Sequence, residues 1–151
     1  MTNKHATSDQ ALLLESQLCF ALHSTSMAMT KTYQPHLKRL GVTYPQYLVL
    51  LVLWERDRLT VSEIGKRLAL DSGTLTPLLK RLETAGLVSR LRDVADERRV
   101  IVQLTASGRK LKSQARPIPA DLVLATGCTQ GEVAELRDRI QALRQQLMNL
   151  P

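Results

Sequence analysis

The chain has 151 residues, of which 44% are hydrophobic and 23% charged, so it fits one folded domain rather than a disordered or repetitive chain. Only one Trp, three Tyr and one Phe occur, and a core built mainly from Leu, Val, Ile and Ala favours helices over a β-sandwich or barrel. The formal net charge of +7 suits a polyanionic partner, a nucleic acid first and an anionic membrane surface second, although a basic protein without such a partner has the same total.

Two helices are predicted in the first third of the chain. Apolar residues at helical spacing predict a first helix over residues 10–40, which Pro35 kinks or interrupts and Gly41 ends. A second helix starts near Pro45, because the first turn of a helix tolerates proline. Its apolar run over residues 47–54 predicts a central, buried position.

A helix-turn-helix follows. Thr60 and Glu63 form a capping-box pattern that starts a short helix. Residues 70–74 have turn and cap chemistry, and they lead into a longer helix that continues to Ala85 and stops at Gly86.

The hydrophobic period then changes from helical to alternating. Residues 87–92 and 100–104 alternate around a charged loop, which predicts a β-hairpin. Helix resumes near Thr105 and fades at two prolines, Pro117 and Pro119.

The last predicted helix starts at a second capping box, Thr129 to Glu132. Its apolar residues recur at spacings of 3, 4, 3, 4 and 3, as in a heptad seam: Val133, Leu136, Ile140, Leu143, Leu147 and Leu150. An amphipathic helix lying on its own core has a similar pattern. Because the seam is narrow and the opposite face strongly polar, we expect pairing with a second copy of the chain in a two-fold dimer.

The order of these elements is that of a winged helix-turn-helix. We therefore expect a mainly α fold with a β-hairpin wing, in one domain over residues 1–151. The DNA-binding part covers about 59–105, and the N- and C-terminal helices, about 10–40 and 120–150, form the dimer.

The basic charge gathers in the same region. Between Lys80 and Arg116 there are ten Lys or Arg against four Asp or Glu, a net of +6 of the chain's +7. A solvated basic face is the alternative to a DNA interface. Pro77 either bends the longer helix or marks a later start for it. The candidate DNA-binding residues are hydroxyls and cations on this helix and in the hairpin: Ser72, Thr74, Thr76, Lys80, Arg81 and Arg90.

The start of the chain lacks the apolar run of a signal peptide, and no stretch approaches the roughly 18 apolar residues of a membrane span. We therefore expect a cytoplasmic protein without membrane contact. Thiols normally stay reduced there, so Cys19 and Cys128 are not expected to form a standing structural disulfide. They are either buried small hydrophobic residues or reactive thiols.

The run over residues 59–105 resembles the MarR family, with LDSGTLTPLLKR at residues 70–81 and DERR at 96–99. The family's wing carries an Asp-x-Arg signature, which Asp96 and Arg98 match. The resemblance implies that Arg98 enters the minor groove of DNA while Asp96 orients its guanidinium. A narrow minor groove has a strongly negative potential, which gives the physical reason for an arginine there.

At the N-terminal end the sequence is similar to the organic-hydroperoxide-sensing, OhrR-like branch of that family, with LCFAL at residues 18–22, Tyr33, and TYPQY at residues 43–47. The similarity covers roughly residues 15–119. It implies that peroxide oxidises Cys19 and that the hydroxyls of Tyr33 and Tyr44 hydrogen-bond its sulfur. The two-cysteine members further imply that Cys128 forms a disulfide with Cys19 of the partner subunit.

The chemistry of the residues agrees with this role without deciding it. A thiolate reacts with peroxide and a thiol does not, and tyrosine hydroxyls are donors that stabilise a thiolate. A cysteine flanked by Leu and Phe is, by itself, more often an inert core residue. Cys128 comes just before a helix, where the helix dipole favours a thiolate.

The sequence thus predicts a redox-responsive repressor that binds double-stranded operator DNA when reduced and is released by an organic hydroperoxide. A ligand-responsive repressor with a structural Cys19, a thiol peroxidase and a sequence-neutral architectural DNA-binding protein are the alternatives. Cys19 and His23 lie four apart, but no second cluster completes a metal site. We expect no cofactor, no metal and no enzymatic activity, because no phosphate loop, nucleophile elbow or carboxylate cluster occurs.

Overall fold

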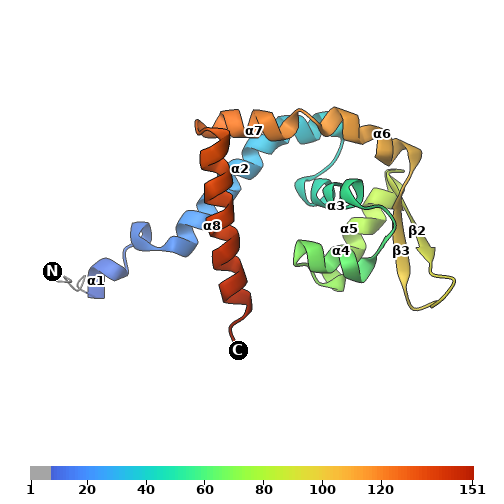
Figure 1. The fold of residues 1–151 in the computed structure, drawn as a ribbon, viewed down its shortest axis with the longest axis horizontal. Coiled ribbons are helices and arrows are strands. Elements are labelled where there is room, and N and C mark those ends of the chain that lie inside the picture. The colour runs from blue at the N-terminus through green and yellow to red at the C-terminus, as the bar shows by residue number, and fades with distance from the viewer. Residues whose placement is uncertain (1–7) are drawn as a thin grey trace.

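The computed structural model describes residues 8–151, which fold into helices and one small antiparallel sheet (Figure 1). The helices are α1 (Ser8–Ala11), α2 (Leu18–Leu40), α3 (Tyr44–Glu55), α4 (Val61–Leu68), α5 (Ser72–Thr84), α6 (Ala106–Ala115), α7 (Ile118–Thr126) and α8 (Gln130–Met148), with a 3-10 turn, η1, at Leu14–Ser16. The strands are β1 (Leu59–Thr60), β2 (Val88–Arg92) and β3 (Val100–Leu104). The mainly α fold with a β-hairpin wing is confirmed.

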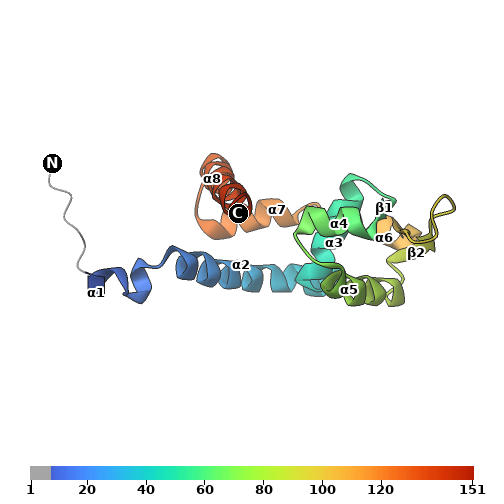
Figure 2. The same cartoon turned by 90° about the horizontal axis from the view of Figure 1, so that it is seen from below.

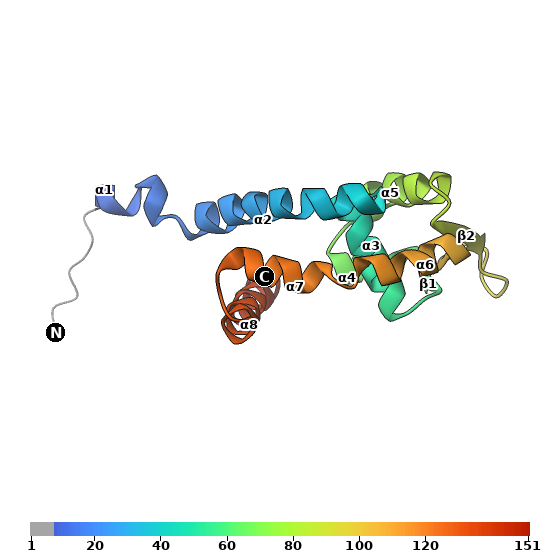
Figure 3. The same cartoon turned by 90° about the horizontal axis from the view of Figure 1, so that it is seen from above.

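The molecule is long rather than round. Figures 2 and 3 show α2 extending along its length, with α1 at one end and a lobe of α3, α4, α5 and the sheet at the other. Helices α6 and α7 run back along the same direction, and α8 leaves α7 at a steep angle (Figure 1). None of the described helices is long and apolar enough to cross a membrane.

The core lies in the lobe, with α3 at its centre. The helix begins at a capping box between Thr43 and Gln46, which the sequence analysis did not identify, and Pro45 occupies its first turn. Val49, Leu50 and other apolar residues of α3 are almost fully buried. The prediction that this helix is central and buried is therefore confirmed.

The helix-turn-helix has the caps that the sequence predicts. In the Thr60–Glu63 capping box, the Thr60 hydroxyl accepts from the backbone N–H of Glu63 and the Glu63 carboxylate accepts from that of Thr60. Ala69 ends α4 in the left-handed region, at φ 53°, and so lets the chain turn into α5. Pro77 lies inside α5, which continues through it from Ser72 to Thr84.

The sheet has the strand order β1-β3-β2, with both pairings antiparallel. In the wing, Val88 lies opposite Leu104 and Arg92 opposite Val100. The two residues of β1, which the sequence analysis did not predict, pair with the middle of β3. This pairing joins the wing to the start of α4.

The first predicted helix is shorter than expected. Instead of one helix over residues 10–40, the chain breaks between α1 and α2, where Leu13 and Gln17 are extended. The Gln17 side chain donates to the carbonyls of Ala11 and Leu13, which replaces helical hydrogen bonds there. The helix then continues without interruption through Pro35 and ends at Gly41, whose φ is 71°.

Helix α7 was missed in the sequence. The sequence predicts that helix fades at Pro117 and Pro119, whereas Pro117 precedes α7 and Pro119 lies in its first turn. The first turn has no internal hydrogen bond for proline to remove. Gly127, at φ 71°, ends α7, and the predicted Thr129–Glu132 capping box begins α8.

Candidate DNA interface and candidate redox centre

The start of α5 is exposed and fixed by its cap. The Asp71 carboxylate accepts from the backbone N–H of Thr74 at 2.7 Å, which holds the pKa of that carboxyl below its usual range. Ser72 and Thr74 are exposed and Thr76 is half-buried. This end of α5 therefore presents two hydroxyls to solvent from a rigid helix, which suits contacts to phosphates and base edges.

An open groove of about 1120 Å³ runs between α4, the start of α5 and the wing, and Met148 at the end of α8 also lines it. Four predicted DNA-binding residues line it together with two further cations: Ser72, Thr76, Arg90, Arg98, Lys66 and Arg99. Of the lining residues only Glu63 is acidic, and hydrogen bonds from Thr60 keep its pKa low. The groove is therefore strongly cationic.

The wing loop is held by its own aspartates. The Asp96 carboxylate accepts from the backbone N–H of Arg98 at 3.0 Å, and the Asp93 carboxylate accepts from that of Ala95. Asp96 and Arg98 form no ion pair among the described residues. Asp96 thus shapes the loop that carries Arg98, whereas the resemblance implied a contact to its guanidinium.

The predicted DNA-binding cations fall into two groups. Arg90 is bound to Glu83 of α5 through its backbone N–H and its guanidinium, with Nη2 3.1 Å from Oε1, which lowers the pKa of Glu83. Arg90 therefore joins the wing to α5. Lys80, Arg81 and Arg98 are exposed and have no ion-pair partner in residues 8–151, so they are free to neutralise phosphate.

Both cysteines are free and exposed. Cys19 is the second residue of α2, and Cys128 lies between Gly127 and the cap of α8. The backbone N–H of Cys128 donates to the Thr126 hydroxyl at 3.1 Å. Neither thiol is buried in its own chain.

Tyr33 and Tyr44 lie together where α2 meets α3. Their ring centroids are 5.0 Å apart, and Tyr47 packs beside them, 5.8 Å from Tyr33. Burial, with Tyr44 and Tyr47 adding to it, raises the pKa of Tyr33 to about 12, and burial raises the pKa of Tyr44. Both hydroxyls are therefore protonated at neutral pH, as hydrogen-bond donors to a thiolate must be.

One chain does not bring Cys19 to these tyrosines. Tyr33 follows Cys19 in the same helix by 14 residues, which at 1.5 Å per residue separates them by about 21 Å. Within residues 8–151 neither the Tyr33 nor the Tyr44 hydroxyl makes a hydrogen bond to another group. A contact between the sulfur and these hydroxyls needs a second chain.

A family model described as "Transcriptional regulator SarA/Rot" matches residues 31–115. The chain is 46% identical over 134 residues to the "Organic hydroperoxide resistance transcriptional regulator" of Bacillus subtilis, which covers 89% of this chain and 91% of that one. The chain belongs to the MarR/SarA-type family of winged-helix transcriptional regulators. The predicted family is thereby confirmed.

Solved structures of other MarR/SarA-type regulators have the same fold. Reduced AbfR bound to DNA, a protein of Staphylococcus epidermidis, is 36% identical and aligns with a TM-score of 0.70 over 91% of this chain and 96% of its own. Disulfide-formed AbfR is 39% identical, with a TM-score of 0.62 over 89% and 90%. Apo MarR of E. coli is 29% identical, with a TM-score of 0.67 over 84% and 96%.

The groove brings together part of the predicted DNA-binding set. The predicted residues that line it come from α5, β2 and the wing loop, whereas Thr74, Lys80 and Arg81 lie on α5 outside its lining. Lys66 and Arg99 also line the groove, although neither is among the predicted DNA-binding residues. Arg99 could have been found, because it follows the Asp-x-Arg signature directly.

A metal site gains no support from the structure. Among the described residues, no group of three or more His, Cys, Asp or Glu side chains is arranged to hold a metal ion. His23 lies one turn after Cys19 on the exposed side of α2.

Proposed function

We propose that the chain is a homodimeric repressor that binds operator DNA when reduced and leaves it when an organic hydroperoxide oxidises Cys19. Oxidation ends in a disulfide between Cys19 and Cys128 of the partner subunit. The observation that carries the proposal is an exposed thiol at the start of α2 and, about 21 Å along that helix, a pair of half-buried, protonated tyrosines, Tyr33 of α2 and Tyr44 at the start of α3. The names of the Bacillus subtilis relative and of the reduced, DNA-bound and disulfide-formed AbfR structures support it.

The DNA contact is proposed from the groove and from α5. Ser72, Thr76 and Arg98 line the groove, and Lys80 and Arg81 extend the basic surface along α5. In a two-fold dimer the two α5 helices enter successive major grooves roughly 34 Å apart on a pseudo-palindromic site. Arg98 at the wing then reaches the flanking minor groove.

The dimer is proposed from apolar surface that one chain leaves uncovered. Helix α8 has no buried residue, and its seam is exposed at Leu136, Ile140 and Leu147. The first half of α2 exposes Leu18 and Phe20. Large apolar side chains exposed along two helices favour a partner that covers them, so we expect a second copy to cover both helices.

The same dimer can bring Cys19 to the tyrosines. Two α2 helices that pack antiparallel across a two-fold axis place the start of one beside the end of the other. With the axis near residue 26, midway between Cys19 and Tyr33, each Cys19 faces Tyr33 and Tyr44 of the partner subunit. The exposed Met27 lies at that midpoint, where an apolar contact between the helices is needed.

The proposed reaction has two steps. The Cys19 thiolate attacks the terminal oxygen of the hydroperoxide, the O–O bond breaks, and the leaving alkoxide takes up a proton to become an alcohol. The sulfenic acid formed on Cys19 then reacts with the thiol of Cys128 of the partner subunit. An S–S bond forms, the S–O bond breaks, and the hydroxyl leaves as water with the thiol proton.

The test is a gel shift under an organic hydroperoxide. The probe is a DNA duplex selected from a random-sequence library by the reduced protein, and the oxidant is cumene hydroperoxide. We expect the parent protein to release the duplex and Cys19→Ser to stay bound, with equal affinity before the oxidant is added. Cys128→Ser is the matched control, because it should form the sulfenic acid but no disulfide between subunits.

The result also separates the alternatives. If Cys19→Ser releases the duplex as readily as the parent, the redox function is wrong and a ligand-responsive repressor takes its place. If hydroperoxide is consumed far beyond one equivalent per chain in the presence of a thiol reductant, the chain is a thiol peroxidase. Equal affinity for all duplexes would indicate an architectural DNA-binding protein.

A further inference from the structure

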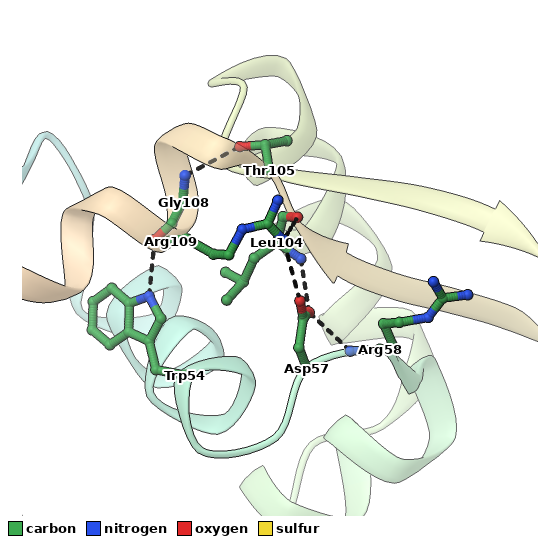
Figure 4. Close-up of polar contacts among 7 residues, drawn as sticks. All are labelled: Trp54, Asp57, Arg58, Leu104, Thr105, Gly108 and Arg109. Carbon is green, nitrogen blue, oxygen red and sulfur yellow. Dashed lines mark hydrogen bonds and ion pairs between the residues drawn. The ribbon is translucent and has the colours of Figure 1, made fainter.

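A carboxylate just after the end of α3 bonds the base of the wing. Asp57 lies in the short loop between α3 and β1, and Figure 4 shows its side chain directed at Leu104, the last residue of β3. Its Oδ1 accepts from the backbone N–H of Leu104 at 2.8 Å and from that of Arg58 at 2.8 Å. Leu104 is 47 residues away in sequence, so this bond is tertiary.

Arg109 completes the contact from α6. Its Nη1 lies 3.6 Å from Oδ2 of Asp57 and donates to the carbonyl of Leu104 at 3.1 Å. Asp57 and Arg109 together therefore bond both the N–H and the C=O of Leu104, and they bond each other (Figure 4). A carboxylate is needed for this, since it accepts at both oxygens and pairs with the guanidinium.

Neighbouring bonds hold α6 in the same junction. The Trp54 indole N–H donates to the carbonyl of Gly108 at 2.9 Å, and the Thr105 hydroxyl accepts from the N–H of Gly108 and donates to the Gly86 carbonyl. The ends of α3, β3 and the start of α6 thus meet in one polar junction. Asp57 is its only acidic residue among those drawn in Figure 4.

The junction lies at the base of the wing, at the opposite end from the loop that carries Arg98. Arg98 precedes Leu104 by six residues, which in extended chain is roughly 20 Å. A tilt of about 5° at Leu104 therefore moves the wing loop by about 2 Å. The other strand of the wing is fixed to α5 by the Arg90–Glu83 pair, and β1 pairs with β3 at Ile101 and Val102. The angle between wing and α5 therefore depends on the Asp57 junction together with these two attachments.

We propose that Asp57 is a positioning residue for DNA binding: through Leu104 and Arg109 it sets the angle of the wing, and thereby places Arg98 on DNA while α5 occupies the adjacent groove. This inference rests on the DNA contact proposed above for Arg98. Asp57 itself touches no DNA, since its carboxylate is committed to groups of its own chain.

The test is a double-mutant cycle on DNA affinity in the full-length, reduced protein. Asp57→Asn keeps the shape and one acceptor but loses the ion pair with Arg109. We expect it to weaken binding to the selected duplex by roughly 2- to 30-fold, the range in which mutations between two sites alter their coupling. In an Arg98→Ala background the same change should weaken binding by less than twofold, because the arginine that Asp57 positions is gone.

Two further variants separate positioning from loss of fold. Arg109→Lys leaves Asp57 in place but removes the planar donor, and it should show the same dependence on Arg98. Glu55→Gln is the matched control, because it breaks the exposed Glu55–Arg67 pair two residues away without touching the wing. All affinities are referred to the active fraction, measured by stoichiometric titration with the duplex.

Each outcome decides between the two proposals. If Asp57→Asn has no effect, or weakens binding by the same factor with and without Arg98, the positioning role is overturned while the DNA contact of Arg98 stands. If Arg98→Ala alone binds as well as the parent, the proposed wing contact is wrong and the role of Asp57 falls with it.

Discussion

At the scale of single residues, Gly108 shows how closely the wing and α6 approach each other. A Cβ built on Gly108 would lie 2.1 Å from the carbonyl oxygen of Leu87, a backbone atom that cannot move aside. Gly108 also supplies the carbonyl that accepts from Trp54. No residue with a side chain fits here without displacing β2 or α6.

We therefore expect Gly108→Ala to lower the free energy of unfolding by about 3 kcal/mol, at the upper end of overpacking costs. Gly131→Ala is the matched control. Its added Cβ would come only within 4.0 Å of the Thr129 hydroxyl, so in α8 it should be neutral or stabilise by up to about 1 kcal/mol. Urea denaturation measures both, and equal stability of the two variants would contradict the close approach at Gly108.

Tyr33 gives a prediction about pH. Burial and the nearby Tyr44 and Tyr47 raise its pKa to about 12 from the ordinary value of 10.0. Between these values the folded protein keeps a proton that the unfolded chain releases, so this contribution to stability is complete below pH 10 and is lost as pH rises through about 12.

Denaturation midpoints from below pH 10 to pH 12 should therefore fall more steeply for the parent than for Tyr33→Phe, which has no proton to lose there. The comparison between the two proteins is needed because Tyr44, Tyr47 and the lysines titrate in the same range. Parallel curves for the two proteins would show that Tyr33 titrates as a free tyrosine does.

At the scale of elements, α5 and the wing should contribute differently to DNA binding. Arg98→Ala should weaken binding by about 1–3 kcal/mol, chiefly on duplexes whose flanks are A·T-rich, because the narrow minor groove supplies the potential that attracts the arginine. Lys80→Ala, at an exposed cation of α5, should weaken binding on all sequences and lower the slope of log K against log salt by about one.

Filter-binding assays over a range of salt concentrations measure both effects. Glu97→Gln serves as the control in the wing loop, since it alters the charge beside Arg98 without removing a donor. If Arg98→Ala is insensitive to the A·T content of the flanks, the wing does not read the minor groove.

Elements whose ends have local chemistry were predictable from the sequence. The Thr60–Glu63 and Thr129–Glu132 capping boxes place the starts of α4 and α8, because each is made by residues three apart. Helix α7 was not predicted because proline is tolerated in the first turn of a helix but interrupts the helix interior. The sequence alone did not show which of these positions Pro119 occupies.

Contacts between distant residues had no such signal. Strand β1 is two residues long and is defined by its pairing with β3. The bond from Leu104 to Asp57 joins residues 47 apart, and an aspartate in a loop is ordinarily read as solvent-exposed. The candidate redox centre was predicted as a set of residues. That one chain keeps Cys19 and Tyr33 about 21 Å apart already follows from their 14-residue spacing in one predicted helix, whereas the packing of Tyr33 against Tyr44 appears only in the structure.

At the scale of the whole molecule, the candidate site has two incomplete halves. The junction of α2 and α3 at the lobe carries Tyr33 and Tyr44, and the other end of α2 carries Cys19 between the exposed Leu18 and Phe20. The proposed two-fold dimer would use each half twice and so make two equivalent redox centres. In that proposal a change at either centre would act on the interface that spaces the two α5 helices, both of which must dock on DNA at once.

This arrangement predicts that the disulfide forms between subunits and never within one. Cys19→Ser chains and Cys128→Ser chains should each give homodimers without a Cys19–Cys128 bond. When the two are unfolded together and refolded, half of the dimers are mixed. Each mixed dimer has one Cys19 and one Cys128 on different chains, which is the pair needed. After cumene hydroperoxide, a non-reducing gel should show a covalent dimer from the mixture and none from either variant alone.

Affinity tags of different size on the two chains identify the product as the mixed dimer and exclude a bond between like residues. The bond requires the two Cα atoms to come within about 7 Å, so oxidation must move α2 of one subunit and the α7–α8 corner of the other together wherever they start farther apart. The oxidised mixed dimer, with one bond, should therefore lose affinity for the selected duplex while the reduced one keeps it. A covalent dimer that still binds the duplex with parent affinity would mean that the disulfide forms but does not release the protein from DNA.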